Sequence, residues 1–175
     1  ALSKLLPLVA FVGSESNRYD PCSPRHDGHP GFTIGDLQSS MGGWLTMVTT
    51  MPDIVVLMAG TNDLAWWTAE NGTQTANRLD AMVTRIQQTL PGVRIVICTI
   101  PPQSSSIVQP NNVDRATLTI QFNAQVRINT QARISSGQRV SLADVNAALN
   151  LSDLRDGIHP TTAAGINKIA PTIKG

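Results

Sequence analysis

Charged side chains are scarce in this chain: Lys, Arg, Asp and Glu make up 14% of its 175 residues, and the formal net charge is +1. The basic residues are scattered, so the sequence has no basic stripe for a nucleic acid and no polybasic patch for an anionic membrane. Its apolar runs are well below the roughly 20 residues that span a bilayer. We therefore expect a globular protein whose partners include neither a nucleic acid nor a membrane.

Cysteine is also rare, with Cys22 and Cys98 alone in the sequence. The two could form a disulfide in an oxidising compartment, whereas the apolar run around Cys98 equally fits a buried free thiol. Lysine is rare, and N-glycosylation sequons begin at Asn71 and Asn150. Chance can produce such tripeptides, but together these features favour a secreted protein with glycans on two surface asparagines.

Four short runs of apolar residues predict β-strands. Their apolar residues are nearly continuous rather than alternating, as expected for strands covered on both faces. The runs cover residues 7–13, 53–60, 93–100 and 139–145. Strands that alternate with helical patterns predict a parallel sheet between helical layers. We expect one domain over residues 1–175, built as a three-layer α/β/α sandwich with a central parallel sheet.

Helical patterns fill the segments between these runs. We expect a first helix that starts near Thr33 and Asp36, and a last short one that begins near Pro160 and is ended by Pro171. Two longer helices are expected between them, over about residues 79–90 and 113–135.

Ligands of such sheets bind beyond the carboxyl ends of the strands, and the stretch DLRDGIHPTTAAG lies there. A histidine that acts as general base needs a second group, usually a carboxylate, to orient its ring. Gly157 permits a tight turn that would bring Asp156 to His159. Pro160 fits the first position of a helix, which would place His159 at or next to the helix start. The alternative is a capping aspartate beside a surface histidine.

A second stretch, AGTNDLAWW, follows another predicted strand. Gly60 allows a sharp turn there, and the Asn62 carboxamide has two N–H donors for a developing oxyanion. Ordinary turn chemistry is the alternative for the Asn-Asp pair. Trp66 and Trp67 come next, either as a stacking face for a sugar ring or with one of them in the core.

The third stretch, RHDGHPGFTIGDL, precedes the first predicted helix. The backbone N–H of Gly31 would lie close to a substrate at that helix start. His26 and His29 lack a third ligand at a recognisable metal-binding spacing. We therefore expect neither a metal nor a cofactor.

Taken in order, FVGSESN, HDGHPGFTI, GTND and DLRDGIHPTTAAG resemble the SGNH (GDSL-type) hydrolases, and within them the carbohydrate esterase family that contains acetyl xylan esterases. The resemblance implies a flavodoxin-like sheet and a serine esterase that removes small acyl groups, such as acetyl, from carbohydrate such as xylan. It assigns Gly31 and Asn62 to the oxyanion hole, and Asp156 and His159 to the catalytic triad. A carbohydrate-binding relative with impaired catalysis and a lipase- or thioesterase-like member are the alternatives.

The family's Gly-Asp-Ser block, which carries the nucleophile, is missing: the only Gly-Asp pair, Gly35-Asp36, continues to Leu37. By resemblance VAFVGSESN corresponds to the family's second strand, so the first, nucleophile-bearing strand is not in the chain. Its absence would leave sheet edges unpaired. In one alternative, PLVAFVG is that first strand and Ser16 is the nucleophile of a degenerate block. In the other, the sequence lacks its natural N-terminus.

Overall fold

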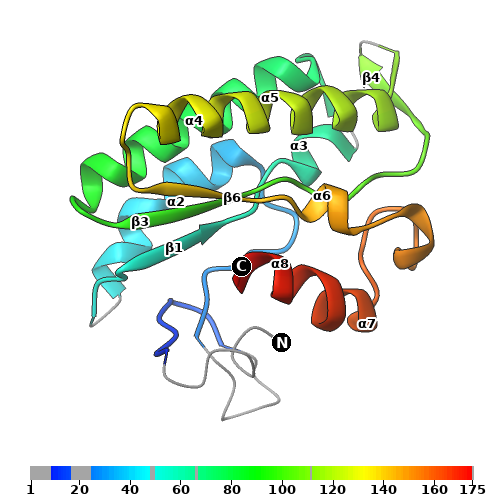
Figure 1. Ribbon diagram of the computed structural model, residues 1–175. Coiled ribbons are helices and arrows are strands. Elements are labelled where there is room, and N and C mark those ends of the chain that lie inside the picture. Colours follow the sequence, from blue (N-terminus) through cyan, green and yellow to red (C-terminus); the bar gives the residue numbers. More distant parts are fainter. Residues whose placement is uncertain (1–8, 17–24, 48–49, 66, 111, 175) are drawn as a thin grey trace.

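Three parallel strands form the central sheet of the computed structural model, which describes residues 9–16, 25–47, 50–65, 67–110 and 112–174 (Figure 1). The strand order is β1-β3-β6. Val55 of β1 lies opposite Ile95 of β3, which lies opposite Val140 of β6. The strands are β1 (Ile54–Leu57), β3 (Arg94–Cys98) and β6 (Val140–Ala143). The predicted parallel sheet is confirmed, with three of its four predicted strands.

Helices α4 (Gly72–Thr89) and α5 (Arg115–Ser135) lie side by side along one face of this sheet, next to α2 (Ile34–Met47) (Figure 1). Helix α2 starts as predicted, with Thr33 and Asp36 exchanging hydrogen bonds in a capping box. The apolar faces of α2, α4 and α5 pack against β3, and their burial builds the hydrophobic core. The core includes Leu79, Val83, Ile95, Ile97, Leu118 and Phe122.

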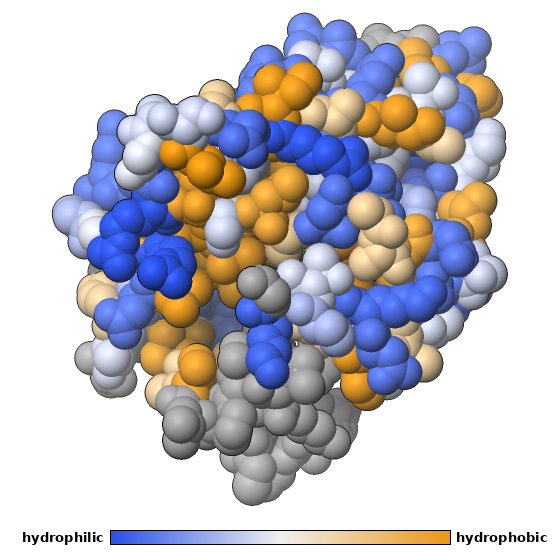
Figure 2. All heavy atoms as spheres, in the orientation of Figure 1, coloured by the Kyte–Doolittle hydropathy of each residue, from blue (hydrophilic) through white to orange (hydrophobic). Residues whose placement is uncertain are grey.

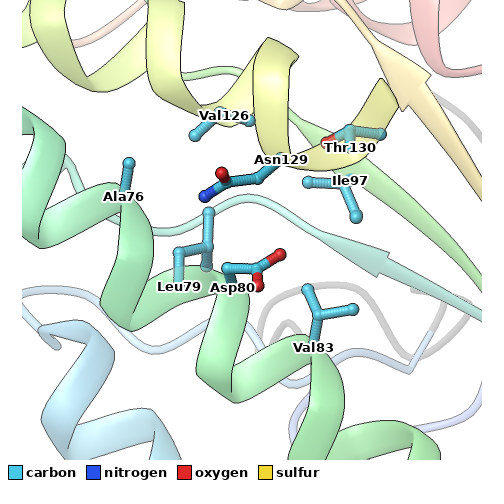
Figure 3. Close-up of a pocket in the computed structure, with 8 residues that line it drawn as sticks. All are labelled: Ala76, Leu79, Asp80, Val83, Ile97, Val126, Asn129 and Thr130. Carbon is cyan, nitrogen blue, oxygen red and sulfur yellow. The ribbon is translucent and has the colours of Figure 1, made fainter. Parts of the chain in front are cut away.

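A small cavity of about 10 Å³ remains between α4, α5 and β3, lined by residues such as Leu79, Ile97 and Val126 (Figure 3). A space of this size holds about one water molecule, so it is a packing gap and no substrate site.

After β6, the chain turns onto the other face of the sheet through α6 (Val145–Ala148), a 3-10 turn (Leu151–Asp153) and α7 (Thr162–Ala164). A π-helical turn (Gly165–Ile169) then leads into α8 (Ala170–Lys174). The prediction that Pro171 ends the last helix is wrong, because this helix continues to Lys174. In the wide π turn before Pro171, the Ala170 N–H donates to the Gly165 carbonyl, five residues back, and the helix continues through the proline.

The predicted strand over residues 7–13 does not form at residues 9–13, and residues 7–8 lie outside the described part of the chain. A strand needs a neighbouring backbone to pair with, and residues 9–13 pair with none of the described strands. A second, small sheet consists of β2 (Trp67–Thr68), β4 (Ile107–Pro110) and β5 (Val113–Asp114).

The second face of the central sheet is only partly covered by the described residues. Ile54 and Val56 of β1 remain 50% and 42% exposed, which corrects the expectation of strands covered on both faces. Apolar side chains gather on this face around a hollow of about 560 Å³ (Figure 2). Among the described helices, none is long and apolar enough to span a bilayer.

Candidate active site

Asp156 and His159 pair as predicted. Asp156 Oδ1 accepts the backbone N–H groups of Ile158, at 3.1 Å, and His159, at 2.8 Å. The second oxygen, Oδ2, lies 2.7 Å from His159 Nδ1. With a carboxylate at this distance, Nδ1 carries the ring proton and Nε2 is left as a proton acceptor.

The turn that holds this pair differs from the predicted helix start. A β-bridge between Leu154 and Pro160 closes it, and the Arg155 N–H donates to the His159 carbonyl at 2.9 Å. The following helix begins later, with Thr161 as its N-cap. The reason is local: Thr161 Oγ1 accepts the Ala164 N–H at 3.2 Å, whereas His159 Nδ1 is engaged with Asp156 and has no lone pair for a cap.

The electrostatics of the pair suit a catalytic base. Hydrogen bonds from the backbone N–H and then the ring of His159 hold the pKa of Asp156 well below its usual range. The carboxylate is therefore charged at neutral pH and can stabilise an imidazolium. The His159 side chain is 56% exposed, and its Nε2 forms no hydrogen bond within the described part of the chain.

Asn62 lies on α3 (Thr61–Ala65), directly after β1 and beside the loop of Gly31. Its Nδ2 donates one N–H to the Phe32 carbonyl at 2.9 Å, which leaves the second N–H for a ligand. Gly31 has φ +82°, and a Cβ built there would meet open space. The two predicted oxyanion donors therefore lie on neighbouring segments, the turn of Gly31 and the start of α3.

Asp63 ties helix α3 to the segment that follows Gly31, which is the loop-holding role that the Asn-Asp turn pattern allowed. It is buried, accepts the Ile34 N–H at 3.1 Å and pairs with Arg78 at 2.8 Å. Burial raises the pKa of Asp63, against the opposing effects of the Ile34 N–H and Arg78. Its position as the fourth residue of the GTND motif is the signal for this role in the sequence.

Both histidines near Gly31 have structural partners. His26 Nδ1 accepts the Gly28 N–H at 3.1 Å. The His29 ring stacks on Trp44 and Phe32, with ring centroids 4.1 and 5.0 Å apart. In the described ranges, no group of three or more His, Cys, Asp or Glu side chains is placed to hold a metal ion.

The chain matches the model of the GDSL-like lipase/acylhydrolase family over residues 13–164. It belongs to this family. The acylhydrolase is also similar to a family 3 carbohydrate esterase from Talaromyces cellulolyticus, with 28% identity, 98% of this chain and 81% of that chain covered, and a TM-score of 0.74. No curated protein matches it.

Two further solved structures resemble the acylhydrolase. An acetyl esterase in which a serine is replaced by alanine, solved with an acetate ion, has 26% identity, coverage of 98% and 84%, and a TM-score of 0.75. A Clostridium thermocellum family 3 carbohydrate esterase has 26% identity, coverage of 98% and 80%, and a TM-score of 0.74. The acylhydrolase is thus an SGNH-fold ester hydrolase related to carbohydrate esterase family 3.

Ser16, the candidate nucleophile, forms no hydrogen bond with the Asp-His pair among the described residues. Ser16 is exposed and follows the isolated bridge between Glu15 and His26. Among the residues that the structure describes, no serine hydroxyl forms a hydrogen bond with the His159 ring. Trp66 and the side chain of Trp67 lie outside the described part, so their predicted stacking role stays a prediction.

The hollow on the open sheet face is separate from this site. Its lining includes Ile54, Arg94 and Val140, the first residues of the three parallel strands. The Asn62 loop instead follows the carboxyl end of β1, and the Asp-His turn comes after β6. The hollow therefore lies at the opposite end of the sheet from the acylhydrolase's candidate catalytic groups.

Proposed function

We propose that this acylhydrolase is a serine esterase that removes acetyl groups from carbohydrate such as xylan. The observation that carries the proposal is the 2.7 Å contact between Asp156 and His159, whose Nε2 has no partner in the described residues. The carbohydrate esterases and the acetate-bound acetyl esterase among its structural neighbours support the acyl group and the substrate class.

In the proposed mechanism, His159 Nε2 takes the proton of a serine hydroxyl as the serine oxygen attacks the acetyl carbonyl carbon. The Gly31 N–H and the free Asn62 N–H stabilise the oxyanion of the tetrahedral intermediate. His159 then gives the proton to the departing sugar hydroxyl. Water, deprotonated by the same ring, hydrolyses the acyl-enzyme and releases acetate.

The serine that acts as the nucleophile in this mechanism is not assigned. Ser16 is the candidate within the chain. A fluorophosphonate probe, followed by peptide mapping, identifies the reactive serine directly. A label on Ser16 assigns it, whereas a label on a peptide outside the printed sequence places the nucleophile in another segment. If no serine is labelled and no acetate ester is hydrolysed, a carbohydrate-binding relative with impaired catalysis replaces the esterase.

Turnover of an aryl acetate tests the reaction, and the His159→Ala variant is expected to lose it. In serine proteases, loss of the triad costs on the order of 10⁶-fold in kcat. A lipase- or thioesterase-like activity is distinguished by acyl length: we expect acetate esters to be hydrolysed faster than octanoate or palmitate esters. The reverse order would contradict the acetyl specificity.

We further propose that the protein is secreted and glycosylated at Asn71 and Asn150. Both residues are exposed, and each uses its Oδ1 to accept a backbone N–H at the start of a helical segment. A glycan attaches through Nδ2, so both caps can persist. Intact mass of protein secreted from a eukaryotic host, compared with the Asn71→Gln and Asn150→Gln variants, tests this.

A further inference from the structure

The loop after β3 lies between the two loops that carry the proposed catalytic groups. Gln103 Nε2 donates to the Thr61 carbonyl at 3.4 Å, and Thr61 directly precedes the oxyanion-hole asparagine. The next residue, Ser104, donates its backbone N–H to the Gly157 carbonyl at 2.8 Å, inside the turn of the Asp-His pair. Gln103 and Ser104, called the connector below, therefore contact both halves of the site.

The connector packs tightly against the Asp-His turn. Gly157 has φ +82°, and a Cβ built there would lie 2.2 Å from Ser104 Oγ and 2.9 Å from Ser104 Cβ. Glycine is thus required at this position on both conformational and steric grounds. Because no space separates the two segments, a shift of the connector displaces the turn as well.

Arg115, in the first turn of α5, holds the connector in place. Its Nε donates to the Ser104 carbonyl at 2.9 Å, and its Nη2 donates to Ser104 Oγ at 2.7 Å. The residue is 6% exposed, and no carboxylate of the described residues forms an ion pair with it. A buried guanidinium is unfavourable unless its donors are used, so these two bonds are its main compensation.

The segment that leads into the connector is anchored to the same helix. Asn123, fully buried on α5, accepts the Ile100 N–H at 2.9 Å and donates to the Ile100 carbonyl at 3.0 Å. Pro101 and Pro102 follow, and their rings restrict the backbone. Helix α5 therefore fixes this loop at both ends.

We propose that the connector, held by Arg115, is the positioning element that sets the distance between the oxyanion hole and the Asp156–His159 pair. This inference rests on the proposed function, because it assigns a role within the same site. Ser104 and Arg115 act through the Gly157 turn and touch no reacting atom. They are positioning residues.

The first test observes the His159 ring and needs no turnover. In protein labelled with ¹⁵N-histidine, the Nδ1 proton that bonds to Asp156 should give a downfield NMR signal, recorded at low temperature to slow its exchange with water because the His159 side chain is 56% exposed. We expect this signal to broaden or disappear in Ser104→Ala and Arg115→Gln, while circular dichroism shows a native fold. Ser105→Ala is the matched control, because Ser105 Oγ bonds to Asp114 at 2.6 Å, away from the turn.

The second test uses kinetics on an aryl acetate. A misplaced base weakens the transition state more than substrate binding, so kcat should fall while KM stays within about twofold. We expect kcat to fall about tenfold in Ser104→Ala and about a hundredfold in Arg115→Gln, the scale of a 1 Å misplacement. Should Arg115→Gln not fold, the milder Ser104→Ala still decides the question.

The outcomes separate this inference from the proposed function. If the ring signal and kcat are unchanged in folded Ser104→Ala, the positioning role is wrong. An equal loss in Ser105→Ala also overturns it, since the effect would then be a general loosening of the loop. A wild-type protein without turnover overturns the esterase proposal alone, and the ring signal still decides the role of the connector.

Discussion

At the scale of single residues, the Asp156 carboxylate performs two tasks. One oxygen accepts two backbone N–H groups and builds the turn, and the other faces the His159 ring. The Asp-x-x-His spacing predicted the pairing, because residues three apart can meet in a tight turn. The bridge between Leu154 and Pro160 could not be predicted in this way, because it depends on how the chain on both sides is held.

The division of tasks predicts the effect of Asp156→Asn. The amide keeps an oxygen for the two backbone N–H groups but turns an NH₂ toward the ring, so the turn persists while the base loses its orientation and charge partner. By analogy with serine proteases, kcat should fall about 10⁴-fold. Steady-state kinetics and circular dichroism measure both effects. Asp156→Ala, which removes both oxygens, should also perturb the turn. A kcat for Asp156→Asn close to that of wild type would contradict the assigned role.

Cys98 gives a second prediction at this scale. It is a free thiol, fully buried in the sheet, and burial raises its pKa to about 12. A neutral, inaccessible thiol does not react with alkylating reagents. We expect iodoacetamide to modify Cys98 only after unfolding, as read by peptide mapping. Labelling of the native protein would contradict this burial. Protection that persists in denaturant until reductant is added would instead indicate a disulfide with Cys22, which lies outside the described residues.

At the scale of elements, α5 supports the loops after β1 and β3. Phe122 packs against Gly60 so closely that a Cβ there would lie 2.5 Å from its ring, and Asn123 hydrogen-bonds Ile100. Apolar periodicity predicted this helix over residues 113–135, close to the observed bounds. It did not predict these contacts, because they depend on which residues of other segments face the helix.

The close approach of α4 and α5 can be tested at Gly72. A Cβ there would lie 2.1 Å from the Leu118 carbonyl oxygen and 2.6 Å from the Phe122 nitrogen. Gly72→Ala should lower the free energy of unfolding by about 1–3 kcal/mol, because backbone must move to admit the methyl group. The control is Gly42→Ala on α2, where a Cβ meets nothing within 4 Å. This variant should raise stability by roughly 0.5–1 kcal/mol. Urea unfolding curves that show the same sign for both would contradict the packing argument.

At the scale of the whole molecule, hydrogen bonds lower the pKa of five aspartates and so favour their ionised form. A hydrogen bond from Arg127 lowers the pKa of Asp144, and one from Lys168 lowers the pKa of Asp153. Asp63 is the exception, since burial raises its pKa. The aspartates with a lowered pKa are Asp36, Asp114, Asp144, Asp153 and Asp156.

These directions predict how stability depends on pH. A carboxyl whose pKa is lowered by folding stabilises the protein above its unfolded pKa of about 3.9, and this contribution is lost as pH falls through the folded value. The free energy of unfolding should therefore decline below about pH 4. Asp144→Asn should flatten the decline. Asp63 acts above about pH 4 and with the opposite sign: its raised pKa makes the folded state bind the proton first, so its contribution to stability rises as pH falls toward 4, and Asp63→Asn should remove this rise. Urea unfolding on both sides of about pH 4 measures the slopes, and an unchanged slope in both variants would contradict the assignment.

The sequence by itself determined the parallel α/β architecture, the start of α2 and the pairing of Asp156 with His159, because each depends on short-range periodicity, capping or turn geometry. It failed at residues 9–13, where apolar character predicts a strand but only a neighbouring backbone can make one. The tertiary structure alone decided that the Asn62 carboxamide meets Phe32 and that Ser104 meets Gly157. These contacts join segments far apart in the chain, and their meeting depends on the order of the strands and on the helix that supports them.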